Sequence, residues 1–342
     1  MRAMRMGAPA GLDTLGIDQC DPGRPGPGEV LVRVRASSLN YHDYLVAVGA
    51  IPTEPGRVPM SDGAGEVVEV GPPALNNVHE PSTEFNVGDA VLGTFFRRWL
   101  EGHPTNWKAA IVSGEHVDGY AREFAVVPAT SLTLAPVGLS PAEAATLPCA
   151  GLTAWRALVG NGALKPGDTV IVQGTGGVSV FALQFAKAIG ASVIATSSSD
   201  EKLARLGELG ADYLINYKRE PKWGKAAKVW TGGRGVDHVV EVGGADTLDQ
   251  SITACRMGGH IAMIGVLAGL AGKVSTARIM LNQIRLQGLT VGSRRDQLDM
   301  IRAIETIRLR PVLDRSFALE QLAAAFRYQQ SGQHFGKIGV VI

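Results

Sequence analysis

Short alternating patterns of apolar and polar residues fill the first 130 positions of the chain. Val30, Val32 and Val34 share one face of a stretch whose other face carries arginines, which predicts a half-buried strand over 29–36. Comparable stretches predict further strands over 63–71, 87–93 and 120–127. A short helix is expected from Asn40 to Val48. Strands at such short spacing indicate a β-rich region, as in a partly open barrel.

The second half of the chain shows a different pattern, in which strand-like and helix-like blocks alternate. The β-branched run 169–172 precedes a glycine cluster and a helix-periodic segment over 178–189. Strands are then expected at 192–196, 212–215, 236–241, 260–264 and 336–342, and helices at 151–159, 200–209, 246–255, 298–308 and 319–330. This alternation predicts an α/β fold with a doubly wound parallel sheet.

The glycine cluster lies where the first of these strands turns into its helix. It reads Gly174, Thr175, Gly176, Gly177 and Val178. Glycines at such a turn let backbone N–H groups and a helix N-terminus approach a pyrophosphate, which predicts dinucleotide binding. A tight turn that binds nothing is the alternative, and the strand that follows at the right distance argues against it. A serine stands in place of the third glycine of the fingerprint.

Residues at the end of the second strand bear on the choice of cofactor. Ser197 and Ser198 occupy the position where a cofactor with a free 2′-hydroxyl usually meets an acid, and Lys202 adds positive charge. Small hydroxyl side chains leave room for a 2′-phosphate, so we expect NADP(H) in preference to NAD(H). Asp200 keeps the alternative open, because its carboxylate could bind a ribose hydroxyl.

Composition narrows the class of protein. The chain has 342 residues, which favours two domains, with 45% apolar residues, 19% charged residues and a formal net charge of +1. This balance predicts neither a nucleic-acid partner nor a membrane surface. Three widely spaced cysteines indicate no disulfide framework, and we expect a cytoplasmic protein. The polar stretch Asn76–Asn86 is expected to form a surface loop.

Several further motifs occur in a fixed order along the chain. They are Asn40-Tyr41-His42-Asp43, Asp62-Gly63-Ala64-Gly65, Val87-Gly88-Asp89, Gly151-Leu152-Thr153-Ala154-Trp155, Lys165-Pro166-Gly167-Asp168 and Asp212-Tyr213-Leu214-Ile215-Asn216-Tyr217. Together they resemble the medium-chain dehydrogenase/reductase superfamily, specifically its zinc-independent, quinone-oxidoreductase-like branch. The resemblance implies a GroES-like catalytic domain over 1–128 completed by 295–342, a Rossmann domain over 129–294, and a substrate cleft at their junction.

The same resemblance implies that this protein holds no metal. Zinc-dependent relatives use a Cys, a His and a third ligand that is usually Cys, and the corresponding positions here are Asn40, Ser61 and Cys149. One thiol and one amide do not complete a tetrahedral catalytic zinc site. The relatives' structural zinc needs four cysteines, and the stretch 97–116 contains none.

Cofactor contacts are also implied by the resemblance. Thr153 is expected beside the nicotinamide, and Tyr217 with Lys202 beside the 2′-phosphate. The remaining positions are expected to line the nicotinamide half or to contribute more weakly, and they are Gly243, Gly265, Val266, Leu267, Gly292, Ser293 and the stretch 335–337.

The expected chemistry is hydride transfer without a metal. Reduction of a quinone or of a conjugated C=C spreads negative charge over the product, so a few hydrogen-bond donors are sufficient. Asn40 and Tyr41 are the predicted catalytic residues, and Tyr41 could also deliver a proton. The leading hypothesis is an NADPH-dependent reductase of quinones or α,β-unsaturated carbonyls.

Two alternatives to this hypothesis remain open at the sequence level. One is an NAD(P)-dependent alcohol dehydrogenase, and the other is a non-catalytic NADPH-binding structural or stress protein. We also expect a homodimer that forms along a sheet edge near His260–Ile264 and Leu286–Val291.

Overall fold

The structure is a computed structural model that describes residues 1–74 and 85–342. Unit 1 comprises Met1–Leu152 and Val291–Ile342, and unit 2 comprises Thr153–Thr290. The first division between them lies later than the predicted boundary after residue 128, because α2 (Pro141–Ala144) packs on strands of unit 1. The functional boundaries at 128 and 294 stay predictions. Most of the predicted loop Asn76–Asn86 lies outside the described residues.

Unit 1 is built mainly from strands. They are β1 (Arg2–Arg5), β2 (Gly16–Gln19), β3 (Glu29–Ser38), β4 (Ala64–Val70), β5 (Ala90–Gly93), β6 (Phe124–Pro128), β7 (Leu132–Leu134), β14 (Leu313–Ala318) and β15 (Lys337–Val341). Its α-helices besides α2 are α1 (Tyr41–Ala47), α9 (Arg294–Ile307) and α10 (Leu322–Gln330). Short 3-10 helices cover Leu12–Thr14, Ala129–Ser131 and Leu319–Gln321, and a π-helical turn covers Leu147–Gly151.

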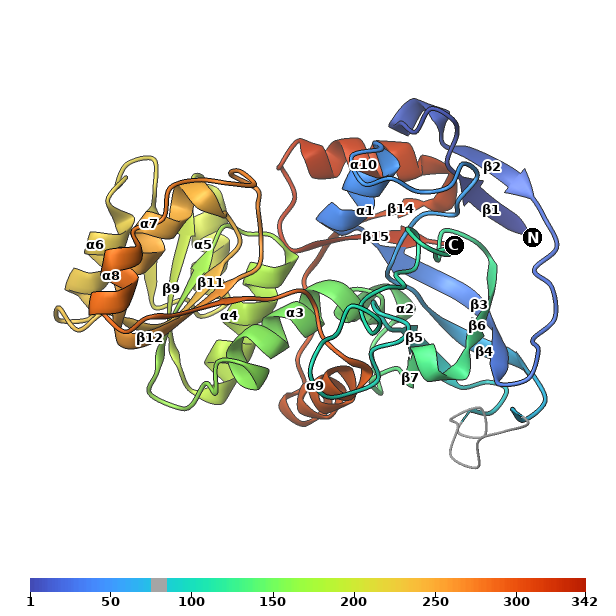
Figure 1. Cartoon of the computed structure of the whole chain (residues 1–342), viewed down its shortest axis with the longest axis horizontal. Coiled ribbons are helices and arrows are strands. Elements are labelled where there is room, and N and C mark those ends of the chain that lie inside the picture. Colours follow the sequence, from blue (N-terminus) through green and yellow to red (C-terminus); the bar gives the residue numbers. More distant parts are fainter. Residues whose placement is uncertain (75–84) are drawn as a thin grey trace. The chain divides into compact units, whose positions relative to one another are not determined.

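Strand β3 organises the main sheet of unit 1. Seven strands form this sheet in the order β14-β15-β3-β4-β5-β7, with β6 paired to β3 outside that path. Val30, Val32 and Val34 on β3 are buried, as their alternation predicts. The C-terminal strand β15 runs antiparallel to β3, and so the last residues of the chain lie beside residues near its start (Figure 1).

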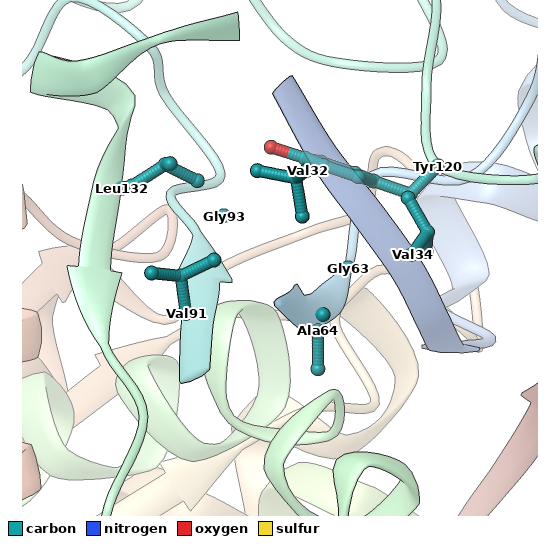
Figure 2. Close-up of a pocket in the computed structure, with 9 residues that line it drawn as sticks. Val32, Val34, Gly63, Ala64, Val91, Gly93, Tyr120 and Leu132 are labelled. Atoms are coloured by element: carbon teal, nitrogen blue, oxygen red, sulfur yellow. The ribbon is translucent and has the colours of Figure 1, made fainter. Parts of the chain in front are cut away.

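Tyr120 packs in the core beside this sheet, where its ring lies among apolar side chains of β3, β5 and β7 (Figure 2). Glycines make room for the ring. A Cβ atom at Gly63 would lie 2.2 Å from Tyr120 Cγ, and one at Gly93 would lie 2.4 Å from the Tyr120 hydroxyl. The space drawn in Figure 2 is therefore part of the apolar core of unit 1, with Tyr120 as its largest side chain.

Unit 2 alternates strands and helices along the chain. Its strands are β8 (Thr169–Gln173), β9 (Ser192–Ser197), β10 (Tyr213–Asn216), β11 (Val236–Glu241), β12 (Cys255–Met263) and β13 (Arg285–Gly288). Its helices are α4 (Gly177–Ile189), α5 (Asp200–Glu208), α6 (Trp223–Trp230), α7 (Ala245–Ala254) and α8 (Thr276–Leu281). Helix α3 (Leu152–Trp155) and a π-helical turn (Arg156–Gly160) lead into the unit.

All strand pairs of the unit 2 sheet are parallel, in the order β10-β9-β8-β11-β12-β13. Helices flank the strands on both faces (Figure 1). The strand order reverses direction between β8 and β11. In doubly wound sheets the carboxyl ends of the strands at such a point form the ligand site, and the glycine turn follows β8 there. The predicted α/β fold with a β-rich partner domain is confirmed.

Some local expectations were wrong. Two segments were expected at the sheet edge. His260–Ile264 lies on β12, between β11 and β13, so this half of the expectation was wrong, whereas Leu286–Val291 begins on β13, which is the end strand. The helix expected at 151–159 is a single α-turn flanked by two π-helical turns. Within the described residues, no helix is both long enough and apolar enough to cross a lipid bilayer.

Candidate cofactor turn and buried polar centre

The glycine turn of unit 2 has the backbone that a phosphate-binding loop requires. Gly174 has φ +69°, a left-handed conformation that favours glycine, and Gly176 is the N-cap of α4. Added Cβ atoms at Gly174 and Gly176 would meet no atom within 4 Å, so the turn faces open space. Together with the N-terminus of the 13-residue helix α4, this open backbone fits a cofactor pyrophosphate.

Ser179 explains how the turn tolerates the loss of its third glycine. The residue is buried, and its Oγ donates a hydrogen bond to the carbonyl of Gln173 at 2.6 Å. The hydroxyl therefore joins the first turn of α4 to the end of β8. The serine that replaces the third glycine therefore keeps α4 in close contact with β8.

A buried carboxylate lies at the carboxyl end of the neighbouring strand β11. Glu241 Oε1 accepts hydrogen bonds from the backbone N–H groups of Gly243 at 2.8 Å and Gly244 at 3.0 Å, and from the Thr247 hydroxyl. Its Oε2 accepts from Gln173 Nε2 at 2.8 Å and from the Ser251 hydroxyl. This network, which sequence reasoning missed, connects β8, β11 and α7 and fixes the loop that contains Gly243.

The loop after β12 contains three more of the predicted cofactor residues. A Cβ atom at Gly265 would lie 2.0 Å from the Val242 carbonyl oxygen, so this close approach of two backbone segments requires glycine. Val266 and Leu267 follow it and are exposed. Thr153 is buried in α3, at the start of unit 2.

The ends of β9 and β10 bring the predicted 2′-phosphate residues together. The backbone N–H of Tyr217 donates to the Ser197 carbonyl at 3.1 Å, and Ser199 caps α5 by accepting from the Lys202 N–H at 3.3 Å. Asp200 is engaged by Asn216 Nδ2 at 2.8 Å and by the Arg219 guanidinium. Arg219, 71% exposed in its side chain, is a cation that sequence reasoning did not identify.

Gly292 was predicted to bind the cofactor, and the structure places it in unit 1, next to the N-cap Ser293 of α9. A Cβ atom there would lie 3.0 Å from Leu152 Cγ and 3.3 Å from Asp296 Cβ. The absence of a side chain at Gly292 thus has a packing reason.

Asn40 and Ser61, the first two positions equivalent to zinc ligands, lie together in unit 1. Asn40 is the N-cap of α1, and its backbone N–H donates to Asp43 Oδ2 at 3.0 Å in a capping box. Asn40 Nδ2 donates to Ser61 Oγ at 3.2 Å, and the Ser61 N–H donates to Asp43 Oδ1 at 2.8 Å. The ammonium of Lys337 donates to Asn40 Oδ1 at 2.6 Å.

Asp62, the residue after Ser61, is a fully buried carboxyl group. Its Oδ2 accepts from Ser38 Oγ at 2.7 Å and lies 3.8 Å from Lys337 Nζ. Its Oδ1 has no hydrogen-bond partner among the described residues. Burial raises the pKa of Asp62 to about 6, and the positive charge of Lys337 limits the rise.

Cys149, the third of these positions, lies on the π-helical turn after α2. Burial raises the pKa of its thiol well above the ordinary range, and the charge of Asp62 raises it further. A neutral thiol, an amide and a hydroxyl are poor zinc ligands. No group of three His, Cys, Asp or Glu side chains that could hold a metal occurs in residues 1–74 and 85–342. By their chemistry the groups at Asn40, Ser61 and Cys149 do not fit a catalytic zinc, and the absence of zinc from the protein stays a prediction.

Tyr41 and His42 follow Asn40 on the first turn of α1. Tyr41 is 43% exposed, and its ring stacks on Tyr44 with centroids 6.0 Å apart. His42 Nε2 lies 2.8 Å from Glu115 Oε2. Burial acts to lower the pKa of His42, but hydrogen bonds and charges from Asp43 and Glu115 outweigh it and leave the pKa raised. Of the two predicted catalytic residues, Tyr41 is exposed to solvent and Asn40 is buried.

Comparison with protein families gives two matches along the chain. Residues 26–137 match the alcohol dehydrogenase GroES-like domain, and residues 177–306 match the zinc-binding dehydrogenase domain. The first match falls in unit 1, and most of the second falls in unit 2.

Individual proteins are similar over nearly the whole length of the chain. A zinc-type alcohol dehydrogenase-like protein of Schizosaccharomyces pombe is 43% identical, with 96% of this chain and 95% of that protein covered. The acryloyl-coenzyme A reductase of Metallosphaera sedula is 28% identical, with 93% of each covered. A crystal structure from Sinorhizobium meliloti 1021 is 38% identical, with a TM-score of 0.91 and with 100% of this chain and 98% of that chain covered.

Proposed function

Because this chain belongs to the medium-chain dehydrogenase/reductase family and is an NAD(P)-dependent oxidoreductase, we propose that it reduces a quinone or an α,β-unsaturated carbonyl compound without catalytic zinc. The observation that carries this proposal is the set of groups at Asn40, Ser61 and Cys149, with the Lys337 ammonium hydrogen-bonded to Asn40. A plain ketone or alcohol gives a localised alkoxide, which zinc would stabilise. Reduction of a conjugated acceptor needs less stabilisation of negative charge, since the charge that forms is delocalised.

A nicotinamide cofactor would supply the hydride when bound, and the side chains of this chain would hold the reactants and place the proton. In the proposal the turn Gly174–Val178 binds the pyrophosphate through its open backbone. Gly243, Thr153 and the stretch Gly265–Leu267 contact the nicotinamide half. The hydroxyl of Tyr41 donates a hydrogen bond to the acceptor oxygen and then its proton, while Asn40 orients the same oxygen.

We further propose that NADP(H) is preferred over NAD(H). The support is the hydroxyl-bearing end of β9 at Ser197 and Ser198, with the adjacent Tyr217 and the cations Lys202 and Arg219. In this proposal the negative charge of Asp200 does not repel a 2′-phosphate, because Arg219 and Asn216 donate hydrogen bonds to its carboxylate.

The names of similar proteins favour a second candidate, an NAD(P)-dependent alcohol dehydrogenase. The relative from Schizosaccharomyces pombe is named zinc-type alcohol dehydrogenase-like, whereas the acryloyl-coenzyme A reductase is named for reduction of a conjugated C=C. The third candidate is a non-catalytic NADPH-binding protein. These candidates differ in measurable ways.

The purified protein should be assayed with NADPH and NADH against a panel of quinones and enones, and with NAD(P)⁺ against alcohols, after elemental analysis. We expect NADPH oxidation by conjugated acceptors and no stoichiometric zinc. Stoichiometric zinc, with alcohol oxidation that chelation abolishes, would establish the alcohol dehydrogenase instead. Tight NADPH binding without turnover on any acceptor would favour the non-catalytic alternative.

The role of Tyr41 has its own test. Tyr41→Phe removes the hydroxyl and should lower kcat by about 100-fold, a typical effect of losing a general acid. Tyr44→Phe is the matched control, because it removes a hydroxyl from the same helix, and it should leave kcat unchanged. Equal rates for wild type and Tyr41→Phe would exclude Tyr41 as the donor.

We also propose that the protein is a homodimer that pairs through β13. Among the described residues this end strand of the unit 2 sheet pairs with β12 alone, and the helix α8 that precedes it carries the exposed apolar side chains Met280 and Leu281. Light scattering should give twice the 36.0 kDa chain mass, and a monomer mass would contradict the proposal. The cytoplasmic location stays a prediction.

A further inference from the structure

Lys337 is a buried lysine at the start of the C-terminal strand β15. Its side chain is 5% exposed, and lysines are rarely buried so fully unless they are paired. Its Nζ donates to the Leu39 carbonyl and to Asn40 Oδ1 at 2.6 Å, and it lies 3.8 Å from Asp62 Oδ2. Two of the three ammonium donors are thus directed at the segment that carries the predicted catalytic asparagine, and the charge also faces Asp62 without a hydrogen bond to it.

An ammonium group can bind only one end of an amide side chain. It donates hydrogen bonds and accepts none, so it holds the oxygen of Asn40 and turns the nitrogen toward Ser61. Without that donor, the Asn40 oxygen and the Leu39 carbonyl would each lose their hydrogen bond to the ammonium. The amide could then rotate and present its nitrogen to the Leu39 carbonyl instead.

The backbone at this centre is fixed by a different residue. Asp43 accepts from the N–H of Asn40 with one carboxylate oxygen and from the N–H of Ser61 with the other. Loss of Lys337 therefore leaves the N-cap of α1 and its contact with the Ser61 segment in place. What Lys337 adds to the centre is the direction of one side-chain amide and a fixed positive charge.

We propose that Lys337 is a positioning residue, which sets the orientation of the Asn40 amide so that a substrate oxygen meets a fixed pattern of donor and acceptor. This proposal rests on the proposed function in that Asn40 acts on substrate. It assigns a role to a residue 297 positions away from Asn40 in the sequence.

The test is a double-mutant cycle with Lys337→Met, Asn40→Ala and the double variant, assayed for NADPH oxidation. Lys337→Met alone should lower kcat by about tenfold or more, as expected when a preorganised donor is lost. In the Asn40→Ala background the same change should alter kcat by less than about twofold, because interacting residues are non-additive. Lys337→Arg, which keeps the charge and the donors, should recover part of the rate.

Two controls separate this role from a general loss of structure. Lys225→Gln changes an exposed lysine on α6 and should have no effect. The NADPH dissociation constant and the melting temperature of each variant show whether the fold and the cofactor site persist. If the effects of Lys337→Met and Asn40→Ala multiply independently, Lys337 does not act through Asn40 and the proposal is overturned.

A crystal structure of Lys337→Met tests the inference even if the reductase activity is absent. We expect the Asn40 side chain to leave the rotamer that bonds Ser61. If Asn40 keeps that rotamer and its bond to Ser61, the positioning role is wrong, whatever the acceptor screen finds. If the rotamer changes and no acceptor is reduced, the proposed function fails while Lys337 still positions Asn40.

Discussion

Glu241 in unit 2 and Asp62 in unit 1 are both buried carboxylates, and they are stabilised by different groups. Glu241 accepts five hydrogen bonds from neutral donors, two of them backbone N–H groups. Asp62 accepts one from Ser38 and relies on the Lys337 ammonium, and its Oδ1 is without a partner in the described parts of the chain.

The difference indicates which centre is rigid and which one responds to its surroundings. A carboxylate whose lone pairs all have donors is a structural anchor, and Glu241 anchors the loop that contains Gly243. A partly satisfied carboxyl next to a cation can change its protonation within an accessible pH range, since the pKa of Asp62 is about 6. The two sites therefore predict different responses to mutation and to pH.

The largest effect is expected from Glu241→Leu. The substitution leaves five donors without their acceptor, and three of them belong to buried residues, namely Gln173, Gly244 and Ser251. Each buried unsatisfied donor costs about 1–3 kcal/mol, so we expect a loss of about 4 kcal/mol or more. Urea unfolding followed by the fluorescence of Trp223 and Trp230 measures it. Glu208→Leu, at an exposed position of α5, is the control and should change little. A loss below about 1 kcal/mol would show that Glu241 is not an anchor.

Asp62→Asn tests the titratable centre. Because the pKa of Asp62 is raised from 3.8 to about 6, the native state binds its proton more tightly than the unfolded state does. Its contribution to stability is thus complete below pH 3.8 and is lost as the pH rises to 6, by about 1.4 kcal/mol per pH unit and about 3 kcal/mol in all.

The asparagine variant has no such titration, so wild type should lose stability relative to the variant between pH 4 and pH 6. Unfolding midpoints across this range give the comparison, and Glu54→Gln at an exposed position serves as the control. A constant difference between wild type and Asp62→Asn would mean that the Asp62 pKa is not raised.

The contribution of His260, on β12 of unit 2, to stability should depend on pH in the opposite direction to that of Asp62. Burial, together with the charges of Arg285 and His238, lowers the pKa of His260 to about 3. The unfolded state then binds more protons below pH 6.5, and wild type loses about 2 kcal/mol between pH 6.5 and 5 through this group. His260→Gln should remove that slope. The same slope in both proteins would assign the acid sensitivity to another group.

Sequence patterns predicted the fold and the glycine turn after β8 because their signals are local. The alternation of valines on β3 and the glycines after β8 depend on neighbours a few residues away. The proximity of Asn40 and Ser61, 21 residues apart, was implied only by resemblance to zinc-ligand positions. The structure now joins them by a hydrogen bond.

The partners of these residues were not predictable in the same way. Lys337 contacts Asn40 across 297 positions, and Glu241 contacts Gln173 across 68. A signal was present, since each is a lone charge in an otherwise apolar stretch, over 337–342 and 239–241. The order of strands in the sheet has no local signal either, and for this reason β12 was mistaken for the edge.

The smallest expected effects come from a matched pair of serines. Ser251→Ala removes one of the five donors to Glu241, and Ser38→Ala removes the hydroxyl that donates to Asp62, so each should cost about 1 kcal/mol at pH 7. The pH dependence should distinguish them. Four donors still hold Glu241, so the loss in Ser251→Ala should be independent of pH between 5 and 8.

In Ser38→Ala the Asp62 carboxylate loses its hydroxyl donor, which raises the Asp62 pKa further, because that hydrogen bond favours the charged form. The stability that wild type loses up to pH 6 should therefore continue to fall at higher pH in this variant. Unfolding midpoints of both variants at several pH values measure the two slopes. Parallel slopes would mean that the two carboxylates are equally anchored and that the contrast between them is wrong.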